Sequence, residues 1–118
     1  MQLTTLITLT SATVASAKCF SGGYTWGPDK TNAIDFMFNA FCKGPGLGAY
    51  KPGQSKHACY QLTADKKVDF TIRNFSPNGH TMSNENCWTY LRPEIAGCEH
   101  GGSSAYTKFE YTPLSNKA

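Results

Sequence analysis

The 118-residue chain lacks the features that define several large classes of proteins. No apolar run approaches the roughly 20 residues that a membrane-spanning helix needs. No block of like charges occurs, and a net charge of +3 does not predict nucleic-acid binding. Cys-x2-Cys and His-x3-His elements are absent, so neither a metal site nor a cofactor is predicted. Repeats and linkers are also missing, which favours one domain.

The N-terminus has the composition of a secretory signal peptide. Leu3–Val14 is uncharged and largely apolar, and Ala15-Ser16-Ala17 has small residues where a signal peptidase reads them. We predict a signal peptide over residues 1–17 and a secreted, extracellular domain over residues 18–118. All five cysteines lie in that domain, as expected for a disulfide-stapled protein. Because five is odd, at least one thiol is left over or pairs with another chain.

Two segments have helical spacing. The first begins near Asp29 or Thr31 and ends at Gly44-Pro45. Its apolar face consists of Ala33, Ile34, Met37, Phe38, Phe41 and Cys42. The second begins at Ser83, and Pro93 predicts a kink or an early end within it. Its apolar face consists of Cys87, Leu91, Ile95 and Cys98.

Alternating apolar residues predict one strand clearly. Val68, Phe70 and Ile72 face one way along residues 67–75, and polar residues face the other. Shorter strands are expected at residues 19–20, 58–62 and 106–112. The order β-α-β-β-α-β favours an α+β fold, a small α/β sandwich whose antiparallel sheet carries two helices on one face.

The cysteine pattern resembles that of the small secreted killer toxins of smut fungi and their relatives. The matching features are Cys19, Cys42, Tyr50-Lys51-Pro52-Gly53 before Cys59, the strand Val68 to Phe75, Asn86-Cys87-Trp88-Thr89-Tyr90-Leu91 and Gly97-Cys98. The glycan-binding-protein family of mushrooms is similar as well, with Cys98-Glu99-His100-Gly101-Gly102 after its second helix. Both resemblances imply a sheet that carries two helices.

The killer-toxin resemblance implies pairs between Cys19 and Cys98 and between Cys42 and Cys87. The family joins the counterpart of Cys59 to a C-terminal cysteine, which this chain lacks. Cys59 is therefore expected to be unpaired in a monomer, or to link two chains in a disulfide dimer. Without that bond, the C-terminal strand is expected to fray.

The first functional hypothesis is a secreted toxin or effector that binds an extracellular protein or channel and acts in virulence. The resemblance implies a functional lysine shortly before Cys59, where this chain has Lys56 and His57. Together with Lys51 they form a basic loop that would bind an acidic target.

The second hypothesis is a lectin. Sugar sites stack a ring on an aromatic side chain and bind hydroxyls through amides and carboxylates. The aromatic candidates are Tyr24, Trp26, Trp88, Tyr90 and Tyr106, with Asn84, Glu85 and Asn86 close to Trp88 and Tyr90 in sequence. The sequon Asn74-Phe75-Ser76 makes Asn74 a candidate for glycosylation of the protein itself.

The third hypothesis is a small secreted ribonuclease, although we expect no enzyme. The residue types for acid, base and phosphate clamp are present as His57, His80, His100, Glu99 and Arg73, but their spacing is not diagnostic. A Cys59 nucleophile beside His57 is the other catalytic possibility, since residues two apart on a strand point the same way.

Overall fold

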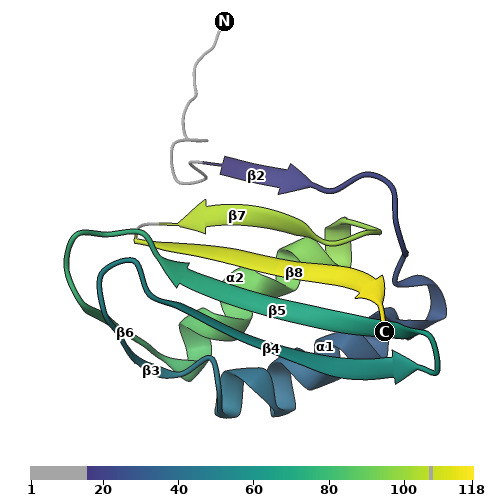
Figure 1. The fold of residues 1–118 in the computed structure, drawn as a ribbon, viewed down its shortest axis with the longest axis horizontal. Coiled ribbons are helices and arrows are strands. Elements are labelled where there is room, and N and C mark those ends of the chain that lie inside the picture. Colours follow the sequence, from purple (N-terminus) through teal and green to yellow (C-terminus); the bar gives the residue numbers. More distant parts are fainter. Residues whose placement is uncertain (1–15, 107) are drawn as a thin grey trace, which may run out of the picture.

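A computed structural model describes residues 16–106 and 108–118. Its main feature is a five-stranded sheet whose two helices lie behind one face (Figure 1). In spatial order, the strands are β2 (Ser16–Cys19), β7 (Gly102–Tyr106), β8 (Phe109–Lys117), β5 (Lys66–Asn74) and β4 (Ser55–Thr63). Each neighbouring pair is antiparallel. The α+β prediction is confirmed.

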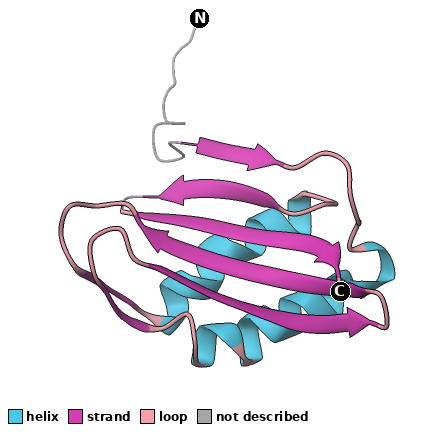
Figure 2. Ribbon diagram, viewed as in Figure 1, coloured by secondary structure: helices cyan, strands magenta, loops and turns pink. Residues whose placement is uncertain are grey.

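The helices are α1 (Lys30–Asn39) and α2 (Asn84–Gly97), drawn in cyan in Figure 2. Short 3-10 turns flank α1 at Gly27–Asp29 and Phe41–Lys43. A separate two-stranded sheet pairs β3 (Gly48–Tyr50) with β6 (His80–Met82).

The second helix begins where the sequence predicts. The Ser83 Oγ accepts a hydrogen bond from the Asn86 backbone N–H, 3.2 Å away, which is an ordinary N-cap. An early end at Pro93 is wrong, since α2 continues to Gly97. Pro93 and Thr89, whose carbonyl loses its helical partner, are both exposed, so water can satisfy that carbonyl.

The C-terminal region differs from the predicted single strand over 106–112. It is a hairpin, because β7 ends at Tyr106 and β8 begins at Phe109. The expected fraying is also wrong. Strand β8 lies inside the sheet and pairs along its whole length with β5, from Asn74↔Phe109 to Lys66↔Lys117.

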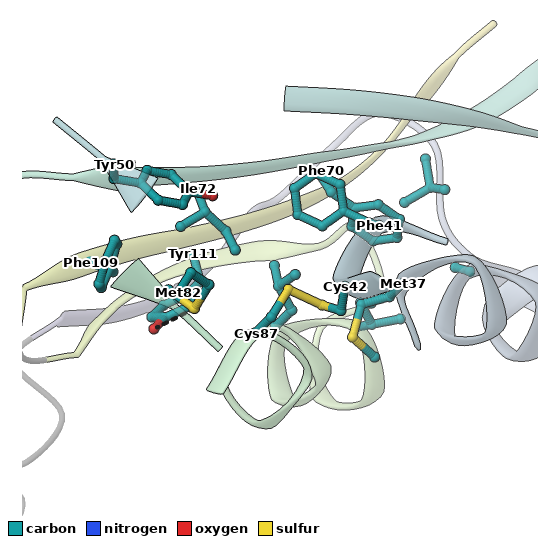
Figure 3. Close-up of a cluster of buried hydrophobic side chains, with 14 of the residues drawn as sticks. Met37, Phe41, Cys42, Tyr50, Phe70, Ile72, Met82, Cys87, Phe109 and Tyr111 are labelled. Carbon is teal, nitrogen blue, oxygen red and sulfur yellow. Dashed lines mark hydrogen bonds between the residues drawn. A yellow bond between two sulfur atoms is a disulfide. The ribbon is translucent and has the colours of Figure 1, made fainter. Parts of the chain in front are cut away.

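The core lies between the sheet and the helices (Figure 3). Val68, Phe70 and Ile72 are buried, as their alternation predicts. The apolar face of the first helix is confirmed except at Phe38, which is 40% exposed. Its ring packs edge-on against Trp88, so it extends the helix–helix contact to the surface.

Two disulfides are present in the described structure, in the pairing that the killer-toxin resemblance implies. Cys42–Cys87 links the turn after α1 to α2 and is fully buried, and its sulfurs are drawn in yellow in Figure 3. Cys19–Cys98 links β2 to the end of α2. Cys59 is unpaired and exposed on β4.

Most of the predicted signal peptide, residues 1–15, lies outside the described residues. Ser16 and Ala17 are described as part of β2, where they pair with Ala105 and Ser104. Cleavage after Ala17 stays a prediction. No helix in the described part of the chain is long and apolar enough to cross a membrane.

Candidate functional site

An open groove lies between α1 and the edge strand β4. Its volume is about 540 Å3, within the range of about 300–1,000 Å3 that is typical of small-molecule sites. The groove is lined by Asn32, Asp35, Phe36, Asn39, Ala40, Gln61 and Leu62.

An aromatic side chain forms the apolar part of this groove. The Phe36 ring stacks on Tyr60 with 5.1 Å between centroids and 12° between planes. Tyr60 in turn contacts the buried Phe70. The phenyl is therefore held against the core and is only partly exposed, so one face can receive the apolar face of a ligand ring.

Polar side chains surround that ring. Asn32, Asp35 and Asn39 share its side of α1, because positions i, i+3, i+4 and i+7 are neighbours on a helix. All three are exposed, and none makes a side-chain hydrogen bond or ion pair within residues 16–106 and 108–118. Across the groove, the Gln61 amide donates to the carbonyls of Thr63 and Ala64. The groove thus offers amide and carboxylate groups that are free to bind hydroxyls.

One end of the groove is fixed by a partly buried ion pair. The Lys66 Nζ lies 2.8 Å from the Asp29 carboxylate, and both side chains are about 15% exposed. The same ammonium donates to the carbonyls of Thr25 and Trp26. These contacts join the segment before α1 to the start of β5, close to both walls of the groove.

A family comparison covers most of the chain. Residues 32–118 match the model of the family described as glycan binding domain Y3. The chain belongs to the Y3 glycan-binding family. No curated protein matches it. The matched region includes every lining residue of the groove, and glycan binding agrees with the expectation that the protein is not an enzyme.

The aromatic residues predicted for this Y3 domain lie in several places. The prediction that Trp26 binds sugar is wrong. This residue is fully buried, and its indole N–H donates to the Cys98 carbonyl, 2.6 Å away. It is a core residue that no sugar can reach. Tyr24 is 37% exposed in the loop before it. Trp88 is half-buried on α2, where it packs against the core and beside Phe38.

Tyr90 and Tyr106 are brought together. Their rings stack with 4.6 Å between centroids, and Tyr90 also contacts the buried Tyr111. Burial raises the pKa of Tyr106 above its ordinary value. None of the five predicted aromatic residues lines the groove.

The predicted basic loop does not form one patch. Lys51 is exposed, but the Lys56 ammonium donates to the Leu47 carbonyl at 2.7 Å and lies 4.4 Å from the centre of the Tyr50 ring. His57 lies on the opposite face of β4, where its Nε2 is 3.1 Å from Asp69 Oδ1. Of these three residues, Lys51 alone is exposed without a side-chain partner among the described residues.

The residues considered for catalysis are also separated. His57, His80 and His100 have different partners, namely Asp69, Ser76 Oγ and the Tyr24 carbonyl. No hydrogen bond between Cys59 and His57 is present in the described structure. No group of His, Cys, Asp or Glu among the described residues is arranged to hold a metal ion.

Asn74 is not an available glycosylation site in the folded protein. Its side chain is fully buried, and the amide donates to the carbonyls of Tyr50, Lys51 and Asn78. A glycan on this nitrogen would replace one of its two hydrogens and would need space that the fully buried side chain does not have. The sequon therefore has a structural explanation, since asparagine is needed here as a hydrogen-bond hub.

Sequence reasoning missed the groove because it assigned the first helix to the core. The available signal was the polar stripe of Asn32, Asp35 and Asn39 on the side opposite the buried Met37. Phe36 sits within that stripe, outside the predicted apolar face. An aromatic residue among polar residues on an exposed helix side was the clue.

Proposed function

We propose that this protein binds an oligosaccharide in the groove between α1 and β4. The observation that carries the proposal is the Phe36 ring, surrounded by unpaired Asn32, Asp35 and Asn39 side chains. A sugar ring has apolar C–H faces and a rim of hydroxyls. It can stack on the phenyl while its hydroxyls bind the amides and the carboxylate. Membership of the Y3 family supports this function.

The charge of the groove favours neutral sugars. Asp35 is its one ionisable lining residue, and no lysine, arginine or histidine lines it. A sialic acid, uronic acid or sulfate group there would lie close to a carboxylate without a compensating cation, which is unfavourable. We therefore expect binding of neutral hexose or hexosamine chains in preference to anionic ones.

A glycan array of the oxidised protein tests this function. We expect binding to neutral glycans, and competition by the free sugar. A double variant, Asn32→Ala with Asn39→Ala, should lose most of that binding, because each lost hydrogen bond costs about 0.5–1.5 kcal/mol. Thr31→Ala is the matched control, since Thr31 is exposed on α1 and does not line the groove. Equal binding by all three proteins would refute the proposal.

The toxin or effector function stays a prediction, as do secretion and virulence. Neither the fold nor the family match bears on them. The basic loop offers less support than the sequence implied, since Lys56 and His57 are engaged on opposite faces of β4. We propose glycan recognition as the molecular step by which such an effector would reach a cell surface.

A further inference from the structure

Three connections meet at one end of the sheet, at the left of Figure 1. They are the β3–β4 loop, the β5–β6 loop and the connection from β7 to β8, of which the structure describes Lys108. We call this end the three-loop tip and define it as residues 50–54, 73–80, 106 and 108–110. It is separate from the glycan groove, whose β4 residues Gln61 and Leu62 lie near the other end of that strand.

The tip is held in shape by Asn74. Its buried amide donates to the carbonyls of Tyr50, Lys51 and Asn78, and its side-chain oxygen accepts from the Ser76 N–H at 3.0 Å. These bonds connect the β3–β4 loop to the β5–β6 loop.

Lys108, just before β8, is attached next to this hub. The Phe75 N–H donates to the Lys108 carbonyl, 3.1 Å away. The side chains displayed at the tip are therefore presented on a preorganised backbone.

An apolar ring and several cations are displayed there. Phe75 is 43% exposed, the highest exposure among the large apolar side chains that the structure describes. Lys51, Arg73 and Lys108 are exposed around it. The one acidic residue in the three segments is Glu110, which is half-buried and faces Arg73 across the β5–β8 pair. The tip thus combines a net positive charge with an exposed phenyl on a rigid frame.

We propose that the three-loop tip docks on an anionic phospholipid surface. The lysines and the arginine would meet the headgroup phosphates and carboxylates, and the Phe75 ring would enter the interface between headgroups and acyl chains. Charge complementarity supports this occupant, and each basic residue near an anionic leaflet strengthens binding about fivefold. A purely polyanionic partner would use the cations but would gain nothing from an exposed phenyl.

Vesicle co-sedimentation tests the proposal directly. The intact protein should bind vesicles of equal parts phosphatidylcholine and phosphatidylserine, should not bind phosphatidylcholine alone, and should be released by high salt. Lys51→Gln with Lys108→Gln should weaken binding roughly 25-fold, at about fivefold for each charge. Phe75→Ser should weaken it about tenfold, because it removes the apolar surface that the interface would bury.

Two control variants distinguish binding by the tip from nonspecific effects of net charge and of exposed apolar side chains. Phe38→Ser removes a ring of nearly equal exposure from α1, and Lys117→Gln removes an exposed cation from the opposite end of β8. Neither should change vesicle binding by more than twofold.

Two results would overturn the proposal. One is vesicle binding that is absent or insensitive to the tip variants. The other is binding that needs Lys51 and Lys108 but not Phe75, with equal affinity for a soluble sulfated polysaccharide. The melting temperature of each variant is compared with that of the parent protein. Equal values exclude a folding defect as the cause of either result.

Discussion

We expect the substitution Asp35→Asn to weaken glycan binding without changing the stability of the fold. The substitution keeps the shape of the side chain but removes the charge of the groove's one carboxylate. A hydrogen bond to a charged group contributes about 1.5–3 kcal/mol, and a neutral one about 0.5–1.5 kcal/mol. The difference of roughly 1.4 kcal/mol corresponds to about a tenfold weaker affinity for a neutral oligosaccharide.

The stability of Asp35→Asn should be close to that of the parent protein. Asp35 is exposed and has no side-chain partner in the described part of the chain, and Asp and Asn have similar helix propensities. We expect the free energy of unfolding to change by less than about 0.5 kcal/mol. Isothermal titration calorimetry with an oligosaccharide identified on the array gives the affinity, and circular dichroism melting gives the stability.

Glu85→Gln is the matched control, since it removes one exposed carboxylate from α2, outside the groove. Its affinity should equal that of the parent protein. The groove assignment is refuted if Asp35→Asn binds within twofold of the parent while Glu85→Gln is weakened.

Three other predictions concern the frame of the domain. Replacing both Cys42 and Cys87 with alanine removes a disulfide that spans 45 residues. The free energy of unfolding, measured by urea denaturation, should fall by about 4 kcal/mol. A fall of less than about 1 kcal/mol would argue that this disulfide contributes little to stability. Burial raises the pKa of the Glu94 carboxyl above 4.5, so the folded protein is destabilised when this group ionises. Glu94→Gln should therefore match the parent in stability below pH 4.5 and exceed it increasingly as the pH rises through the raised pKa. Melting temperatures of the two proteins that differ by the same amount at every pH would contradict this. Cys59 is unpaired and exposed, so Cys59→Ser should leave the melting temperature and glycan binding unchanged. It should abolish any disulfide-linked dimer on a non-reducing gel. A lowered melting temperature would show instead that the thiol supports the fold.

The sequence predicted most of the fold because its local signals agree with the final packing. Alternation at Val68, Phe70 and Ile72 defined a core strand, and the cap at Ser83 defined the start of α2. The hairpin formed by β7 and β8 was missed, because its short turn interrupts a run of strand-forming residues.

The candidate site could not be predicted to the same extent. Exposure of an aromatic residue depends on tertiary packing. The sequence therefore pointed to Trp26, which is fully buried, and not to Phe36, which lines the groove. The groove also needs two elements, α1 and β4, that are far apart in sequence. Their approach depends on contacts such as Lys66 with Asp29, for which no local pattern exists.

The central claim is that glycans bind between α1 and β4, and one comparison tests it most directly. The parent protein and the Asn32→Ala/Asn39→Ala variant are applied to the same glycan array at matched concentration, after melting curves show that both are folded. The account predicts binding of the parent to neutral glycans and loss of that binding in the variant. Identical binding by both proteins, or binding confined to anionic glycans, would contradict it.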